Sequence, residues 1–410
     1  MLLLLTSLAF ATLEPNSTSP DSQTTEQDAT VQEEEVSKEE TKEEQESTEE
    51  DTTEEPSDSD PEATEDVEEA PAEGEEDTNE EGTEEEEESK PPELTPEERL
   101  QNLYQQWKKI DEEAHYKQVQ KFLQTGNYAS ASERLLYLSK FHDGYNTQYF
   151  WAFYYELTED LELSVELFEK LNNAIEMDED KQDWKEELRI ESLFRLGVIY
   201  DDLQQYDQAQ DIFKIVRKEV KGDPISKHLL QLLIGTSQIH EGKSWRGVRK
   251  IAKSFPKIPA EDGTWIQSRT RNALVFELIR RSEVKKFVGV NKKDRNTMIE
   301  KMKLLKDGEA QVVASIQLGE VEYVIKSLLQ IIDGYTRLYD EIVAAPAPKE
   351  LTEEQKKDYK TETKEKAIVL LKAAYNYANK GVVFAQQAQW EGDSYDEILS
   401  RQNALKQELE

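Results

Sequence analysis

The sequence predicts an all-α fold, in which antiparallel helical pairs stack as a repeat solenoid and a long antiparallel helical hairpin follows them. Apolar residues at helical spacing predict the helices. Small residues at positions 131, 164, 209 and 247 predict where the two helices of a pair cross closely. Threonine and proline signals predict where helices begin and end. An acidic segment without aromatic residues precedes the helices and is predicted to be disordered.

Residues 1–11 are predicted to be a signal-peptide-like segment. The run MLLLLTSLAFA is apolar, is too short to span a bilayer as a helix, and ends in an A-x-A cleavage pattern. The basic residues that usually precede such a run are missing, so either the start codon lies further upstream or the signal is unusual. We therefore expect export to the periplasm or cell envelope, and no transmembrane helix. The chain has no Cys, which removes disulfides and lipid attachment through cysteine.

Residues 12–94 are predicted to be an acidic disordered linker. Between residues 14 and 90 the chain has 35 acidic and 3 basic residues, a net charge of −32 out of −39 for the whole sequence. No Phe, Trp or Tyr occurs from residue 11 to residue 103, so this part cannot bury enough apolar surface to offset the entropy of ordering it. We expect a self-repelling, extended tether, and the low pI is mostly its property.

Residues 95–242 are predicted to form the helical pairs. Thr95 as an N-cap and Pro96 at the first helical position predict that ordered structure begins near residue 95. The clearest pair spans residues 191–220, where Gly197 leaves room for a partner helix and Ala209 supplies the small residue at the crossing. The residues that complete this pattern are Leu193, Leu196, Tyr200, Tyr206, Phe213 and Val216.

This unit resembles the tetratricopeptide repeat (TPR), whose pattern runs W-x2-L-G-x2-Y, then A-x3-F, then P over about 34 residues. Here Leu193 takes the place of the Trp, and Pro224 falls about three residues late. The resemblance implies a curved solenoid whose product is a binding groove rather than a catalytic pocket.

Three further units align with this pattern more loosely. The steps between crossing residues are 33, 45 and 38 residues, and the longer steps imply extended helices or inserted turns such as the acidic stretch 176–184. A generic amphipathic helical bundle is the alternative, chiefly for the degenerate fourth unit. The matching residues are Leu123, Gly126, Tyr128, Ala131, Leu135 and Leu138; then Ala152, Tyr155, Ser164, Phe168 and Leu171; and then Leu232, Gly235, Gly242, Gly247 and Ile251.

The resemblance to TPR proteins implies that the first helix of each pair lines a concave binding face. The positions assigned in this way are aromatic with acid at one edge, which suits an extended or helical peptide that carries basic residues. The alternative is that the aromatic residues pack against neighbouring helices and the acidic residues form a solvated helix end. The predicted groove residues are Tyr116, Gln120, Asn146, Tyr149, Phe153, Glu156, Phe194, Val198, Asp201 and Asp202.

Residues 243–307 are predicted to be a degenerate repeat and a basic helical region. From residue 243 to residue 306 there are 18 basic and 6 acidic residues, a net charge of +12. An anionic lipid, a cell-wall polymer or the protein's own acidic linker would match this charge, whereas a solvated helix face needs no ligand. No nucleic acid is expected, because no zinc-ligand set or recognition motif accompanies the charge. The predicted basic patch comprises Arg246, Arg249, Lys250, Lys253, Arg280, Arg281, Lys285 and Lys286.

Residues 308–410 are predicted to form a C-terminal helical hairpin and a tail. Apolar spacing predicts the first arm over residues 310–344, before a Pro-x-Pro turn. Thr352 as N-cap and Gln355 as its capping-box partner predict the start of the second arm, which runs to about Trp390. The turn and cap resemble the C-terminal hairpin of envelope TPR proteins in gliding deltaproteobacteria, and this resemblance implies a periplasmic scaffold within a multiprotein envelope machine.

No catalytic site, metal site or cofactor is predicted. The four His residues fall in different units without a second ligand at metal-binding spacing, and neither a nucleophile elbow nor a phosphate-binding glycine loop occurs. We therefore expect a non-enzymatic scaffold or adaptor in the bacterial cell envelope that binds a protein partner. The alternative is a binder of an anionic surface polymer or lipid through residues 243–306, and a steep salt dependence would favour it.

Overall fold

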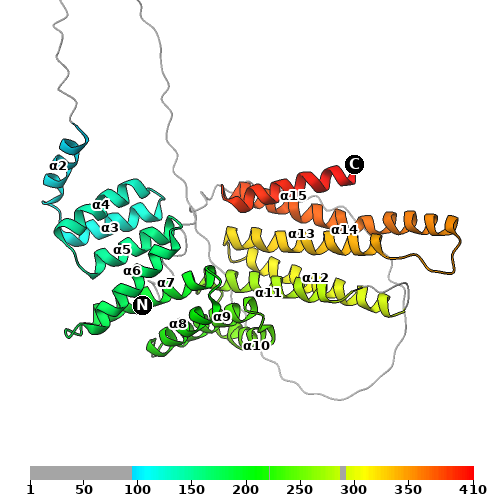
Figure 1. Cartoon of the computed structure of the whole chain (residues 1–410), viewed down its shortest axis with the longest axis horizontal. Helices are drawn as coiled ribbons and strands as arrows, with labels where there is room; N and C mark the ends of the chain where they lie inside the picture. The colour runs from blue at the N-terminus through cyan, green and yellow to red at the C-terminus, as the bar shows by residue number, and fades with distance from the viewer. Residues whose placement is uncertain (1–94, 221, 287–291) are drawn as a thin grey trace, which may run out of the picture. The chain divides into compact units, whose positions relative to one another are not determined.

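The structure, a computed structural model, describes residues 95–220, 222–286 and 292–410. Within these ranges it contains fourteen α-helices, one short 3-10 helix and no strand, which confirms the predicted all-α fold (Figure 1). The predicted signal-peptide-like segment 1–11 and the acidic linker 12–94 lie outside the described residues.

The helices follow one another with short connections. Their bounds are α2 (Pro96–Trp107), α3 (Glu112–Gln124), α4 (Tyr128–Phe141), α5 (Tyr145–Leu157), α6 (Leu161–Met177), α7 (Asp183–Asp202), α8 (Tyr206–Glu219), α9 (Pro224–His240), α10 (Ser244–Ser254), η1 (Phe255–Lys257), α11 (Thr264–Val284), α12 (Lys292–Ile316), α13 (Val321–Ala344), α14 (Glu353–Gln387) and α15 (Asp393–Leu409).

Consecutive helices pack as pairs: α3 with α4, α5 with α6, α7 with α8, α9 with α10, α11 with α12, and α13 with α14. The second helix of a pair also contacts the first helix of the next pair, as α6 contacts α7 and α8 contacts α9. α15 packs on α14 and α13. Each amphipathic helix therefore buries its apolar face against neighbours on two sides, which a single pair could not do alone.

The clearest predicted pair is formed by α7 and α8. A Cβ atom on Gly197 would lie 2.6 Å from Cε1 of Phe213, so glycine is what lets the two helices approach. Ala209, Phe213 and Val216 are fully buried at this crossing. The spacing in the sequence thus identified both the pair and its point of closest approach.

The degenerate fourth unit also forms a pair, α9 with α10. A Cβ atom on Gly235 would lie 2.7 Å from Cγ1 of Ile251 and 3.1 Å from the carbonyl oxygen of Gly247. A Cβ atom on Gly247 would in turn meet the carbonyl oxygen of Gly235. The two glycines face each other, and they allow backbone to pack directly on backbone.

The predicted long hairpin is formed by α13 and α14, but its first arm begins later than expected. Residues 310–316 complete α12, and a turn separates them from α13, which begins at Val321. Gly319 has a φ of +79° in this turn, a conformation that favours glycine and ends a helix even where the apolar spacing continues. The predicted boundary between residues 307 and 308 therefore falls inside α12, and the expected tail contains α15.

The predicted capping box at the start of α14 is confirmed. The backbone N–H of Gln355 donates to Oγ1 of Thr352 at 3.3 Å, and the backbone N–H of Thr352 donates to Oε1 of Gln355 at 2.9 Å. These two bonds satisfy donors that the first turn of a helix otherwise leaves without partners.

Buried apolar side chains form two clusters that meet in α11. The first runs from Trp107 to Ala273, and the second runs from Val275 to Leu405. α11 contacts α9 on the side of the first cluster and contacts α12 and α13 on the side of the second. This helix therefore belongs to both cores and joins the shorter pairs to the longer ones.

Candidate functional site

A cleft of about 650 Å³ lies across α7, between α6 and α8. Its volume falls in the range of specific ligand pockets, although its lining mixes charged and apolar side chains. The lining residues are Glu169, Asn172, Asn173, Glu176, Lys181, Glu186, Arg189, Leu193, Leu196, Ile212, Ile215 and Glu219.

The apolar part of the cleft comes from α7 and α8. Leu193 and Leu196 are three residues apart on α7, and Ile212 and Ile215 are three residues apart on α8, so each pair lies on one helix face. Ile215 is 39% exposed, whereas Phe213 and Val216, which face the crossing of α7 and α8, are buried. Leu193 and Leu196 are buried, at 7% and 3% exposed, so the apolar strip that is open to solvent in the cleft is formed by Ile215 and the half-buried Ile212.

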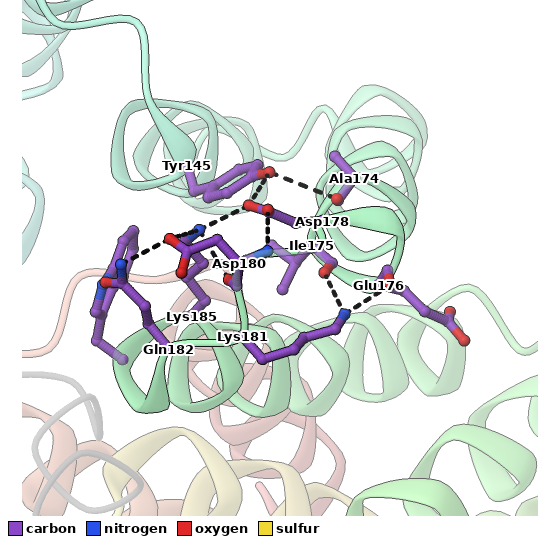
Figure 2. A network of polar contacts seen from close by, with 10 residues as sticks. Tyr145, Ala174, Ile175, Glu176, Asp178, Asp180, Lys181, Gln182 and Lys185 are labelled. Atoms are coloured by element: carbon purple, nitrogen blue, oxygen red, sulfur yellow. Dashed lines mark hydrogen bonds and ion pairs between the residues drawn. The ribbon is translucent and has the colours of Figure 1, made fainter.

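A polar network at the corner between α6 and α7 fixes one end of the cleft (Figure 2). Lys185 Nζ donates to Oδ2 of Asp178 at 2.7 Å and to Oδ2 of Asp180 at 2.9 Å. Tyr145 of α5 donates its hydroxyl to the same Asp178 oxygen at 2.9 Å. The bond from Lys185 is the main cause that lowers the pKa of Asp178 to about 2, so this carboxylate stays charged at neutral pH.

Lys181, at the same corner, caps the C-terminal end of α6. Its Nζ donates to the carbonyl oxygens of Glu176 at 2.8 Å and Ile175 at 3.3 Å, as Figure 2 shows. These carbonyls belong to the last turn of α6, where the helix dipole is negative and a cation is favourable. Lys181 therefore stabilises the helix end. Its charge also adds to the bond from Arg189, the main cause that lowers the pKa of Glu186 in the cleft.

The cleft is acidic overall, because its lining has four carboxylates against two cations. Arg189 donates to Glu186 at 2.9 Å and 2.5 Å, and this bonding raises the pKa of Arg189. Glu176 and Glu219 raise it further by their charge, which places them near the same guanidinium. Glu169 accepts a hydrogen bond from Tyr200. One cation thus stands among several carboxylates, and the rim retains negative charge.

The predicted groove lies on the other side of α7. At 3.6 residues per turn, Phe194, Val198 and Asp202 point about opposite to Leu193 and Leu196. The predicted groove residues therefore do not line the cleft, and the structure engages most of them in contacts within the chain.

Three of the predicted positions, Tyr149, Phe153 and Glu156, surround Arg195 together with Glu191, in what we call the Arg195 cluster. Arg195 Nε donates to the hydroxyl of Tyr149 at 2.9 Å, and Nη1 donates to both carboxylate oxygens of Glu156, at 3.0 and 3.1 Å. The guanidinium lies 3.8 Å from the ring centroid of Phe153, and Glu191 completes the cluster at 3.3 Å. Tyr149 and Phe153 are buried. This cluster joins α5 to α7.

Asp201 and Asp202 were predicted to select basic residues of a partner. In the structure they bind Arg269 of α11. Arg269 Nη2 donates to Asp201 at 2.6 Å and to Asp202 at 2.7 Å, and Nη1 donates to the hydroxyl of Tyr323 at 3.2 Å. The Asp201 side chain is only 2% exposed. A cation of the chain itself therefore occupies the position that was predicted for a partner's cation.

The remaining groove positions are only partly accessible. Tyr116 hydrogen-bonds to Oγ1 of Thr147 at 2.9 Å and stacks on Phe150 with ring centroids 5.7 Å apart. Burial is the main cause that raises the pKa of Tyr116 to about 12. The other positions are half-buried or buried, namely Gln120, Asn146, Phe194 and Val198.

The structure divides the predicted basic patch. Arg280 and Arg281 both donate to Glu277, at 2.8 and 2.6 Å, and the Glu277 side chain is buried. Lys285 pairs with Glu300. These cations neutralise carboxylates of the chain, and Lys286 beside them is exposed. The second group is different, because it lies along α10 and makes no ion pair within the described residues: Arg246, Arg249, Lys250 and Lys253.

Sequence reasoning missed the cleft, although one signal pointed to it. The step of 45 residues between the crossing residues 164 and 209 required an insertion, and residues 176–184 were recognised as its site. The insertion builds the corner of Figure 2 and lengthens α6 to 17 residues, and Tyr145 at the start of α5 reaches the carbonyl oxygen of Ala174 near the end of α6. What the sequence did not reveal is that α8 and the lengthened α6 leave part of α7 uncovered between them.

Comparison with known proteins gives no further assignment, because no family model matches the chain and no curated protein matches it. Among the described residues, every helix is too short or too polar to serve as a membrane-spanning segment. The same ranges contain no group of three or more His, Cys, Asp or Glu residues placed to hold a metal ion.

Proposed function

We propose that this chain is a non-enzymatic, TPR-type scaffold or adaptor, and that its protein partner docks in the cleft across α7. The observation that carries the proposal is the composition of the cleft, an open apolar strip bordered by carboxylates. Repeated helical pairs with glycine and alanine at their crossings support the relation to TPR proteins. Such arrays present extended surfaces to partner segments.

The matching partner segment carries apolar side chains and Lys or Arg. Ile212 and Ile215 would take the apolar side chains, and burial of their exposed surface would supply the main driving force. Glu176 and Glu219 would meet the cations at the rim, where charge selects the partner more than it adds affinity. An amphipathic helix laid into a groove satisfies both requirements.

We further propose that the protein is exported and works in the bacterial cell envelope, as part of a multiprotein machine. The apolar run of residues 1–11 with its A-x-A ending supports export. The likeness of the α13–α14 turn and cap to the hairpin of envelope TPR proteins supports the envelope location.

A synthetic peptide tests the docking proposal. The probe is a fluorescent helical peptide of 16 residues with leucine along one face and lysine flanking that face, and its control has every lysine replaced by glutamate. Titration of the full chain, followed by fluorescence anisotropy, should show binding of the lysine peptide at least about tenfold tighter, since two rim charge pairs contribute roughly 0.5–1 kcal/mol each.

Matched variants of the chain locate the binding. Glu176→Lys with Glu219→Lys should abolish the preference for the lysine peptide. Glu365→Lys with Glu408→Lys makes the same change in net charge at exposed sites on α14 and α15, and should leave the preference intact. Equal loss in both double variants, or no preference in the unchanged chain, would reject the cleft as the docking site.

A further inference from the structure

The exposed side of α10 carries a row of cations without counter-charges. Arg246, Arg249, Lys250 and Lys253 recur at intervals of three, four and seven residues, so they follow one face of the helix. α10 contains no Asp or Glu, and none of the four makes an ion pair with a described carboxylate. The opposite side of α10 is anchored on α9 through the Gly235–Gly247 contact. The helix therefore presents its charged side outward on a rigid support.

Cations of α8 extend this row. Burial lowers the pKa of Lys250, and the positive charges of Lys214 and Arg217 on α8 lower it further, so these two cations lie close enough to act on it. Lys214 is itself paired with Asp211 at 2.7 Å, whereas Arg217 makes no ion pair within the described residues. The unneutralised charge thus spans two helices that are not adjacent in sequence.

One large apolar side chain stands beside these cations. Trp245 is 72% exposed, and it lies one helical turn before Arg249 on the same face. Trp favours the boundary between water and lipid headgroups, because its ring is apolar and its N–H remains a hydrogen-bond donor. An exposed Trp among solvated cations is thus better suited to a membrane surface than to water alone.

We propose that the outer face of α10, extended by Arg217 of α8, docks on the surface of an anionic lipid bilayer. The cations contact phosphate headgroups, and Trp245 enters the interface between them. The helix lies on the surface and does not insert, because its apolar side is already buried against α9. This surface is distinct from the cleft across α7, and the proposal does not depend on a partner in that cleft.

The residues proposed to contact the membrane differ from those that the net charge of the sequence segment alone would indicate. Arg280 and Arg281 belong to the same basic stretch of sequence, yet they neutralise the buried Glu277. Arg217 lies outside that stretch but belongs to the surface. A soluble anionic polymer would also be attracted to the charge, but it would gain little from Trp245.

Co-sedimentation with lipid vesicles tests the proposal. The full chain is mixed at low salt with vesicles of phosphatidylcholine containing 30% phosphatidylglycerol, and with vesicles of phosphatidylcholine alone. Binding to the anionic vesicles only, and weakening as salt is added, is the expected result. Residues 14–90 carry the same net charge of −32 in the chain and in every variant, so their repulsion from anionic vesicles is common to all samples.

Two kinds of variant test which residues form the membrane-binding surface. Arg246→Gln, Arg249→Gln and Lys250→Gln together should weaken binding about a hundredfold, on the order of fivefold for each cation removed. The matched triple Lys357→Gln, Lys360→Gln and Lys364→Gln removes three exposed cations of α14 and should change binding less than about threefold. Trp245→Ala leaves the charge unchanged and removes no buried contact, and it should weaken binding several-fold.

Three results would overturn the proposal. The full chain could fail to bind anionic vesicles at low salt, or both triple variants could lose binding equally. Trp245→Ala could have no effect while heparin or a short DNA duplex binds as tightly as the vesicles, which would reassign the face to soluble polyanions.

Discussion

The two sides of α7 differ in how the chain uses polar side chains. On one side, Arg195 and Arg269 draw carboxylates and tyrosine hydroxyls from α5, α7 and α13 into closed clusters. On the other side, Glu176 and Glu219 border an open apolar strip, and no cation from another helix is paired with them within the described residues. The first side holds helices together, and the second side is available to a partner.

The position of a residue in a helical repeat does not by itself determine whether it can bind a partner. A buried ion pair needs its partners from within the chain, because an uncompensated charge is costly there. Of the predicted groove positions, Glu156 is paired in this way with Arg195, and Asp201 and Asp202 are paired with Arg269. Binding capacity is left where the packing of neighbouring helices leaves apolar surface and charge uncovered.

The largest effect is expected from Arg269→Ala. This change leaves the buried Asp201 without its cation and should lower the free energy of unfolding by about 3–5 kcal/mol, measured by chemical denaturation. Arg401→Ala, which removes an exposed arginine that pairs with Asp333 at 3.3 Å, should cost less than about 1 kcal/mol. Similar costs for the two variants would mean that the Arg269 cluster does not hold α7, α11 and α13 together.

A smaller effect is expected from Tyr149→Phe in the Arg195 cluster. The variant keeps the ring but removes the oxygen that accepts from Arg195, and a hydrogen bond to a charged group contributes about 1.5–3 kcal/mol. Denaturation should show a loss in this range without a change in peptide binding at the cleft. Tyr154→Phe on the same helix is the control, since its ring is half-buried and its hydroxyl makes no hydrogen bond with a described residue. A loss of peptide binding in Tyr149→Phe with unchanged stability would make the predicted groove, rather than the cleft, the docking face.

Gly197→Ala should disturb both sides of α7 moderately. The added methyl group meets the buried ring of Phe213, and such overpacking costs about 1–3 kcal/mol, part of which the better helix propensity of alanine offsets. Gly308→Ala in α12 meets only the terminal methyl of Ile331, at 2.8 Å, and this methyl can move aside, so its net change should be near zero. The two melting temperatures provide the comparison, and a larger loss for Gly308→Ala would contradict the account of the α7–α8 crossing.

Changes in the cleft itself should leave stability almost untouched. Glu176→Gln with Glu219→Gln alters surface charges that make no ion pair within the described residues, so unfolding should shift by less than about 0.5 kcal/mol. The affinity for the lysine peptide should still fall several-fold. A clear loss of stability would show that these carboxylates belong to the structural charge network, as those on the other side of α7 do.

The smallest effect is expected on stability at low pH, and it arises at the corner between α6 and α7. Because the pKa of Asp178 is lowered, its carboxylate contributes stability that is complete above its ordinary pKa near 3.8 and is lost as pH falls through about 2. Asp178→Asn removes this contribution at every pH. The stability difference between the two chains should therefore be constant from pH 7 to pH 5 and should shrink between pH 4 and pH 2. A difference that stays constant to pH 2 would contradict the role of the Lys185 bond.

The sequence predicted local structure better than it predicted the site. Gly197, Ala209 and Phe213 mark a crossing through side-chain size, which a spacing pattern records directly. The capping box of Thr352 and Gln355 is equally local and was found as predicted. The end of α12 was missed, because the apolar spacing runs through Gly319 into α13 and only the backbone conformation there ends the helix.

The contacts that decide where binding can occur join residues far apart in the chain. Arg195 meets Glu156 across 39 positions, and Arg269 meets Asp201 across 68. No local pattern encodes such pairs, because they depend on which helix faces lie together after packing. The cleft has the same origin, since it is the part of α7 that neither α6 nor α8 covers.

A charge-swap titration tests the central claim most directly, that a partner docks in the cleft rather than on the opposite side of α7. The chain with Glu176→Lys and Glu219→Lys is titrated against the glutamate version of the helical peptide, beside the unchanged chain with the lysine version. The account predicts that the swapped pair binds about as tightly as the original pair, while both mixed pairs bind weakly. Equal affinity in all four combinations would show that the peptide binds elsewhere, and the cleft would lose its proposed role.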